Sequence, residues 1–91
     1  MTEKRLFNDH ILITPDVMPH DDEFELWATI YLHNNAFSAL DFEQGADRHL
    51  MRFKFQHTPF NLNFEHYSQS LWINTDSELD SALLPELFLS L

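Results

Sequence analysis

Large apolar side chains recur at two different spacings along this chain, and the change of spacing separates predicted helix from predicted strand. Between residues 24 and 31 they recur every three or four positions, which is the period of one helix face. From residue 36 to residue 65 they tend to occupy every second position, which is the period of a strand with one buried face. We therefore expect a helix followed by a series of strands.

The predicted helix starts at a cluster of acidic residues, 21–23, because carboxylates in the first turn complement the helix dipole. His20 or Asp21 is expected close to its cap, and Asn34-Asn35 is expected to end it. One side of the helix would carry an apolar stripe. This stripe consists of Phe24, Trp27, Ala28, Ile30 and Tyr31.

The two ends of the chain supply further elements. Arg5 to Ile13 is expected to be extended and to stop at Pro15, and Asp9 can divide it into two shorter pieces. The C-terminal segment is expected to be helical, and its Pro85 either starts a second short piece or kinks one helix. The predicted order of elements is β-α-β-β-β-β-α.

Four strands are expected in the middle of the chain. The first two cover residues 36–44 and 48–56 and are joined by a turn at Gly45, the only glycine. The next two cover residues 60–65 and the surroundings of Leu71–Ile73.

Hairpin geometry predicts how these strands pair. If residues 56–59 form a loop, the large apolar groups of the two flanking strands fall on one face, and a slip by one residue would destroy that agreement. The first strand, taken as strictly alternating, sets Phe37 and Phe42 on opposite faces. The predicted register pairs Phe55 with Phe60, Phe53 with Leu62, Met51 with Phe64, Lys54 with Asn61, Arg52 with Asn63 and His49 with His66.

These elements predict a two-layer α+β sandwich, formed by a single domain over residues 1–91. An antiparallel β-meander would have one apolar face covered by both helices and one polar face open to solvent. Because Trp72 lies between two apolar neighbours, strict alternation turns one of these groups outward. The open face is expected to carry Arg48, Leu50, Arg52, Lys54, Asn61, Asn63, Glu65, Tyr67 and Trp72.

Composition narrows the class of protein. The 91 residues are 44% hydrophobic and 14% aromatic, which is typical of a folded domain rather than a disordered chain. The chain has no cysteine, so disulfides, thiolate ligands and a cysteine nucleophile are excluded. It has no signal-like start and no apolar stretch near the roughly 20 residues of a membrane span, so we expect a cytoplasmic location.

The charge is strongly negative, with 15 acidic and 5 basic residues and a net charge of -10. This balance argues against general nucleic-acid binding and against adsorption to an anionic membrane. It can steer the protein toward a basic partner, or it can serve only to keep the protein soluble.

Three of the five basic residues, Arg48, Arg52 and Lys54, lie on one predicted strand. With Tyr67 and Trp72 they are candidates for a partner-binding face, because arginine and aromatic side chains are enriched at binding hot spots. The alternative is a ladder of exposed cross-strand ion pairs, each contributing about 0–1 kcal/mol. The carboxylates for such a ladder are Asp41, Glu43 and Glu65.

Six histidines are present, and the predicted register brings His49 and His66 together. With Asp47 nearby, these residues offer two imidazoles and a carboxylate, a set that can hold zinc or iron. The competing interpretation is a hydrogen-bonded histidine pair at the edge of the core, which is the commoner arrangement. We therefore predict no bound metal and no other cofactor, and we keep these three residues as the candidate ligands.

Catalytic motifs are lacking. The serines lack a G-x-S-x-G turn, and one glycine is too few for a phosphate-binding loop or a dinucleotide fingerprint. Helix capping explains the carboxylates at residues 21–23. We therefore expect a protein that is not an enzyme.

The C-terminal segment holds more apolar residues than one face of a short helix can bury. It either packs around the core or contributes to a homodimer contact, so the protein is expected to be a monomer or a dimer formed through this segment. The residues concerned are Leu83, Leu84, Leu87, Phe88, Leu89 and Leu91.

Three strings in the centre of the chain carry a resemblance. Residues 45–49 (GADRH), 62–68 (LNFEHYS) and 71–73 (LWI) resemble a small acidic gammaproteobacterial family of unknown function. The resemblance covers residues 45–73 and implies a bacterial cytosolic α+β protein of about this length. It transfers no catalytic role to any residue.

Three functions follow as hypotheses. The first is a non-enzymatic module that binds another protein, through the open sheet face or through the acidic start of the first helix. The second is an acidic inhibitor, antitoxin or immunity-type protein that neutralises a basic partner. The third is a metal-dependent enzyme that uses His49 and His66.

Overall fold

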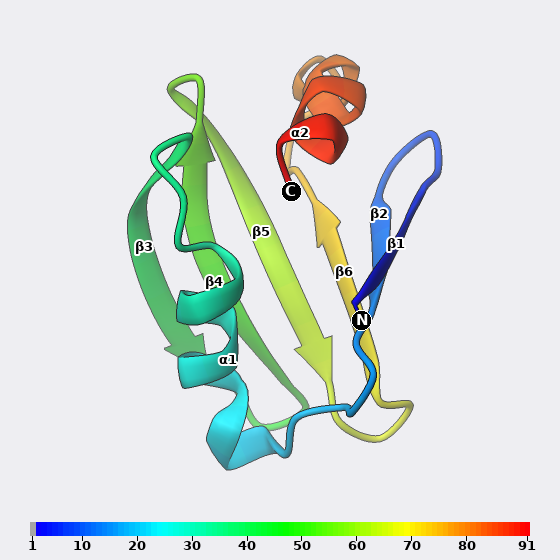
Figure 1. Cartoon of the computed structure of the whole chain (residues 1–91), viewed down its shortest axis with the longest axis vertical. Helices are drawn as coiled ribbons and strands as arrows, with labels where there is room; N and C mark the ends of the chain where they lie inside the picture. The colour runs from blue at the N-terminus through cyan, green and yellow to red at the C-terminus, as the bar shows by residue number, and fades with distance from the viewer. Residues whose placement is uncertain (1) are drawn as a thin grey trace.

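Six antiparallel strands form one sheet, and two helices cover one of its faces (Figure 1). The computed structural model describes residues 2–91. The strand order is β1-β2-β6-β5-β4-β3, so an N-terminal hairpin joins a four-strand meander where β2 pairs with β6. Short 3-10 turns, η1 and η2, lead into the helices. The elements are β1 (Glu3–Leu6), β2 (Ile11–Thr14), η1 (Asp21–Glu23), α1 (Phe24–Tyr31), β3 (Phe37–Gln44), β4 (Arg48–Phe55), β5 (Thr58–Glu65), β6 (Ser70–Asn74), η2 (Asp80–Leu83) and α2 (Leu84–Ser90).

The predicted α+β architecture is confirmed, with one change at the N-terminus. The extended segment expected there is two strands, so the described elements run β-β-α-β-β-β-β-α. The chain reverses near Asp9, where the Phe7 N–H donates to the His10 carbonyl at 2.9 Å. β2 then pairs with β6, with Ile11 opposite Ile73. The hairpin therefore extends the sheet by two strands, and β2 adds the buried Ile11 and Ile13 to its apolar face.

The β4–β5 hairpin has a tighter turn than the sequence predicts. Gln56 and His57 form its loop, and both have positive φ angles, 52° and 65°, as a type I′ turn requires. The register therefore differs by two residues from the predicted one. Because side chains alternate with a period of two, this shift leaves each of them on the predicted face. The observed pairs include Phe55–Thr58, Phe53–Phe60, Met51–Leu62, Lys54–Pro59, Arg52–Asn61 and His49–Phe64.

Strand β3 does not alternate strictly, contrary to the prediction. Its register against β4 shifts between Ser38 and Asp41, and Ala39 has a φ of 55°. Phe37 lies opposite Phe55 before this bulge, and Phe42 lies opposite Met51 after it. The extra residue therefore turns both phenylalanines toward the core.

The core lies between the helices and the sheet. Phe24 and Ala28 of α1 and Leu84 and Leu87 of α2 are fully buried against the apolar side chains of the strands. Trp27 and Tyr31 stack on each other at the edge of the core, with ring centroids 4.9 Å apart. Ile30, predicted to belong to the buried stripe, is 65% exposed.

The C-terminal segment packs on the sheet of its own chain. Pro85 lies in the first turn of α2, where its missing N–H costs nothing, so it starts this helix rather than kinking it. At the other end, the Lys4 Nζ donates to the carbonyls of Phe88 (2.6 Å) and Leu91 (3.1 Å). A lysine at this place satisfies terminal carbonyls and complements the helix dipole.

Gly45 lies in the turn between β3 and β4, as predicted. A Cβ at this position would lie 2.5 Å from the backbone oxygen of Arg48, so the turn needs a residue without a side chain. Among the described helices, none combines the length and apolar character needed to cross a membrane.

Candidate functional site

The face of the sheet opposite the helices carries most of the predicted binding residues. Arg48, Arg52 and Lys54 of β4 share this outer face with Trp72 of β6, whose neighbours Leu71 and Ile73 point into the core. Tyr67 does not belong to it. It lies in the turn between β5 and β6, is 78% exposed and contacts the ring of His66 at 4.8 Å.

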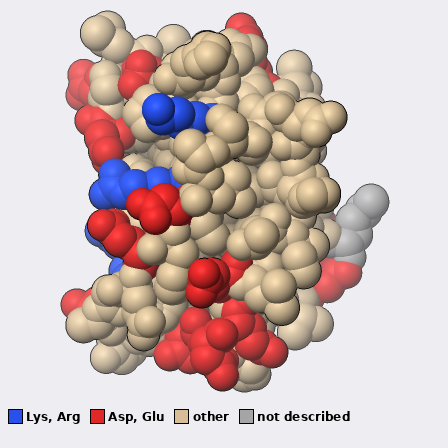
Figure 2. All heavy atoms as spheres, turned by 90° about the vertical axis from the view of Figure 1, so that its left-hand side faces the viewer, with Lys and Arg blue, Asp and Glu red and all other residues tan. Residues whose placement is uncertain are grey.

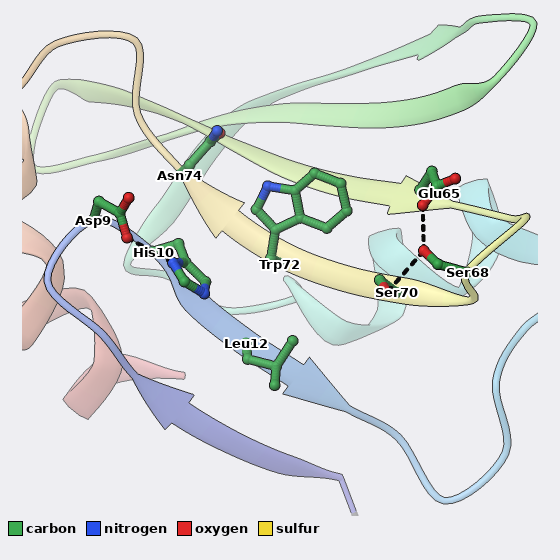
Figure 3. Close-up of a pocket in the computed structure, with 8 residues that line it drawn as sticks. All are labelled: Asp9, His10, Leu12, Glu65, Ser68, Ser70, Trp72 and Asn74. Carbon is green, nitrogen blue, oxygen red and sulfur yellow. Dashed lines mark hydrogen bonds and ion pairs between the residues drawn. The ribbon is translucent and has the colours of Figure 1, made fainter.

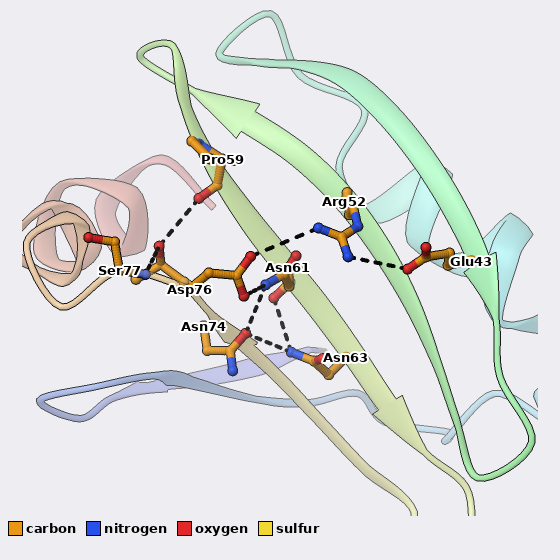
Figure 4. A network of polar contacts seen from close by, with 9 residues as sticks. Glu43, Arg52, Pro59, Asn61, Asn63, Asn74, Asp76 and Ser77 are labelled. Carbon is orange, nitrogen blue, oxygen red and sulfur yellow. Dashed lines mark hydrogen bonds and ion pairs between the residues drawn. The ribbon is translucent and has the colours of Figure 1, made fainter.

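Arg52 is held by carboxylates from two sides (Figure 4). Its guanidinium is 3.4 Å from a carboxylate oxygen of Glu43 on β3 and 3.9 Å from one of Asp76, just after β6. The first of these pairs belongs to the ion-pair ladder that the sequence predicts. Both pairs are solvent-exposed, so each contributes little to stability, about 0–1 kcal/mol.

Asparagines fill the space between β5 and β6 beside Arg52 (Figure 4). Asn61 and Asn63 are 8% and 3% exposed, although they belong to the outer face. The Asn63 amide donates to the Asn74 side-chain oxygen at 3.0 Å and to the Trp72 carbonyl at 3.3 Å. The Asn61 amide donates to Asp76 at 3.1 Å. These buried amides therefore have protein partners.

Trp72 borders a hollow of about 370 Å³ on the outer face (Figure 3). The guanidinium of Arg48 lies 5.9 Å from the centre of the Trp72 ring, a cation–π arrangement. At the far side of the hollow, the His10 ring is hydrogen-bonded to Asp9 at 2.7 Å, and this bond lowers the pKa of the Asp9 carboxyl. Other lining residues are Leu12, Glu65, Ser68, Ser70 and Asn74.

The histidine pair meets on the other side of the sheet, at the end where α1 begins. His49 is buried on β4 and His66 directly follows β5, with ring centroids 5.9 Å apart. Their strand positions differ from the prediction, since His49 lies opposite Phe64. Asp47 borders a hollow together with Arg48 and Trp72 and is not part of the cluster around the two histidines.

Asp21 takes the place that the sequence assigned to Asp47. One possible ligand atom from each of Asp21, His49 and His66 lies within 4.8 Å of the other two. Asp21 belongs to the η1 turn and comes to the strands only because α1 packs across them. Sequence spacing contains no signal for this contact, since the residues are far apart along the chain.

A third surface was missed from the sequence. Val17, Leu26 and Ile30 are 79%, 67% and 65% exposed, and together with Met18 and Trp27 they line a groove of about 560 Å³. We call this surface the α1 groove. The carboxylates of Asp22 and Glu23 also line it. The sequence does contain a signal for this surface. Leu26 and Ile30 are four residues apart and so share one side of the helix, which is not the side of the buried residues 24 and 28.

The comparisons with known proteins give a family and no function. Neither the curated proteins nor the solved structures contain a significant match to this chain. A family model matches the chain well beyond residues 45–73, which carry the resemblance to a family of unknown function. The chain belongs to the family described as "Protein of unknown function (DUF3630)", whose model matches residues 2–91.

Proposed function

We propose that this protein is a non-enzymatic binding module whose α1 groove docks a basic amphipathic segment of a partner protein. The observation that carries the proposal is the exposure of Val17, Leu26 and Ile30 beside acidic side chains. Contiguous exposed apolar side chains with a polar rim mark interaction sites in soluble proteins. The apolar residues would contact the apolar face of the segment.

Charge supports a basic partner. Acidic side chains gather at the end of the molecule where α1 begins, apart from the basic ones (Figure 2). Within residues 2–91, the ion pairs of arginine involve Glu43 and Asp76, and none involves residues 21–25. No arginine therefore neutralises the carboxylates beside the groove, although that of Glu23 accepts a hydrogen bond from the His20 N–H. The net charge of -10 would steer a cationic segment toward them.

The proposal keeps two expectations from the sequence, that the protein is not an enzyme and that it acts in the cytoplasm. An inhibitor or immunity-type protein that neutralises a basic partner is the narrower form of the same function. It uses the same groove and the same charge, so the binding experiment below tests the shared chemistry.

A designed peptide tests the groove directly. The probe is a fluorescent helical peptide with one leucine face and one lysine face, and the control peptide has glutamate in place of lysine. We expect the wild type to bind only the lysine peptide, and less tightly as salt rises. L26S/I30S should weaken binding at least tenfold. L79S/L89S removes two leucines that are 87% and 81% exposed elsewhere and should bind like the wild type.

Two results would overturn the proposal. One is equal binding of the lysine and glutamate peptides, which would show adsorption to any apolar surface. The other is equal loss in L26S/I30S and L79S/L89S, which would show that the groove is not special. Thermal melts of all variants establish that each is folded.

The outer sheet face is the second candidate surface, for an acidic partner. The hollow beside Trp72, with Arg48 over its ring, favours it. R48Q/R52Q removes both guanidinium groups, and it should abolish binding of a glutamate-rich peptide if this face is used. Binding that persists in R48Q/R52Q would exclude the face around Arg48, Arg52, Lys54 and Trp72.

A further inference from the structure

Two buried imidazole nitrogens have no partner among the described residues. They are the Nδ1 atoms of His49 and His66. His49 is 4% exposed and its ring lies among Phe24, Phe42 and Phe64, at centroid distances of 5.8–6.4 Å. A buried polar atom without a partner is unfavourable, and native structures resolve such atoms with water, an ion or a functional role.

A second imidazole and a carboxylate lie close to the His49 imidazole. His66 and Asp21 supply these two groups. The three candidate atoms, one each from Asp21, His49 and His66, lie within 4.8 Å of one another. Ligands of a tetrahedral zinc ion at about 2.0–2.2 Å lie roughly 3.4 Å apart. Asp21 is exposed on a short turn, where its carboxylate accepts a hydrogen bond from the Asp22 N–H at 3.1 Å. Binding of an ion therefore requires small side-chain movements that bring the three atoms closer together.

We propose that Asp21, His49 and His66 bind a divalent transition-metal ion, and that Zn²⁺ fits this donor set best. Imidazole and carboxylate ligands suit zinc, and the absence of thiolates argues against the softer Cu(I). Each imidazole binds the ion through one nitrogen in its neutral form. The competing interpretation, a hydrogen-bonded histidine pair, leaves the two Nδ1 atoms unexplained.

The site has an access path and room for a fourth ligand. A hollow of about 240 Å³ reaches His49 from the surface, and Asp21, Asp22, Glu25 and Gln44 line it. Zinc sites with three protein ligands keep a water or another ligand at the fourth position. The hollow therefore leaves that position open to solvent or to a neighbouring carboxylate.

A bound ion would join separate parts of the fold. Asp21 lies in η1 immediately before α1, His49 lies on β4, and His66 follows β5. The ion would tie the start of the helix to two strands of the sheet. Since the unfolded chain does not hold these residues together, binding should stabilise the folded protein.

Zinc titration of the full chain tests the proposal. The protein is purified without a histidine tag, stripped with EDTA, and titrated with Zn²⁺ by calorimetry, with thermal melts in parallel. We expect one ion per chain and a melting temperature that rises with Zn²⁺. H66Q should abolish detectable binding, and D21N should weaken it at least tenfold. These two residues are preferred to His49 as targets because they are less buried.

Matched controls separate this site from other histidines and carboxylates. D47N changes the carboxylate that sequence spacing favours, and H57Q changes an exposed histidine in the β4–β5 turn. Both should bind Zn²⁺ like the wild type. The proposal is wrong if the wild type binds no Zn²⁺ at micromolar concentration, or if D21N and H66Q bind it as tightly as D47N and H57Q do. None of these outcomes depends on the α1 groove.

Discussion

Buried polar side chains on the two faces of the sheet differ in whether they have hydrogen-bond partners. On the outer face, Asn61 and Asn63 are almost fully buried, and their amides donate to Asn74, Asp76 and backbone oxygens. On the inner face, His49 is equally buried, and its Nδ1 has no partner among the described residues. The asparagines form a hydrogen-bonded network, whereas His49 belongs to the zinc site that we propose. Burial alone therefore does not show whether a polar group has hydrogen-bond partners.

The largest expected effect is the gain in folding stability when zinc binds at the inner face. At a free Zn²⁺ concentration 100 times the dissociation constant, stability should rise by about 2.7 kcal/mol, and the melting temperature by roughly 10–20 °C. H49F should remove this gain, while its stability without metal stays within about 1 kcal/mol of the wild type, because the ring joins three phenylalanines. Melts with and without Zn²⁺ measure both effects. A loss of several kcal/mol in metal-free H49F would mean that the histidine is structural.

Asn63→Ala is expected to have the next largest effect, now on the outer face. The substitution removes the Asn63 amide from the Trp72 carbonyl and leaves the Asn74 side-chain oxygen with only the longer bond from Asn61, 3.4 Å, so we expect a loss of about 1–3 kcal/mol. Urea unfolding measures it, and Lys54→Ala, an exposed position on the same face, is the matched control. The same loss should occur with or without Zn²⁺. Surface substitutions usually change stability by no more than about 0.5 kcal/mol. A loss of stability that differs from that of the control by less than this would show that the network is dispensable.

A change in the β4–β5 turn is expected to stabilise the protein. His57 has a φ of 65°, which glycine adopts without strain. H57G should therefore raise stability by about 1 kcal/mol. Thr58→Gly, next to it but in β5, should lower stability instead. If H57G is destabilising in urea unfolding, the two-residue turn and the β4–β5 register that it sets are both in doubt.

Arg52→Gln is expected to have the smallest effect. Its ion pairs with Glu43 and Asp76 are exposed, so the loss should be about 0–1 kcal/mol and should shrink as salt is added. Urea unfolding at low and high salt measures it. A loss above 2 kcal/mol that persists at high salt would show that Arg52 belongs to the asparagine network rather than to the solvated surface.

Much of the architecture is predictable because it depends on local spacing. The first helix, the four strands of the meander and the turn at Gly45 all follow from the period of the apolar residues. The assignment of side chains to the two faces also follows, outside β3, because an error of two residues in register preserves it. The bulge at Ala39 interrupts the alternation in β3, and no glycine marks it.

The candidate sites are less predictable, because each combines residues from distant parts of the chain. Arg48 and Trp72 were assigned to one face correctly, and His49 and His66 do meet. Tyr67 was misplaced because β5 ends at Glu65, before the alternation in the sequence suggests. The α1 groove was missed because the prediction counted Ile30 with the buried stripe, whereas Ile30 lies with Leu26 on the exposed side of α1.

The periods, the two faces of the sheet and the family can be recognised from the sequence, since each is encoded in neighbouring residues. The two-residue turn at Gln56 and His57, the pairing of β2 with β6, and the position of Asp21 rather than Asp47 beside the histidines depend on the folded structure. The physical reason is the same in each case. Periodicity specifies on which face of the sheet a side chain lies. The packing of α1 and the geometry of the turns specify which side chains on that face contact one another.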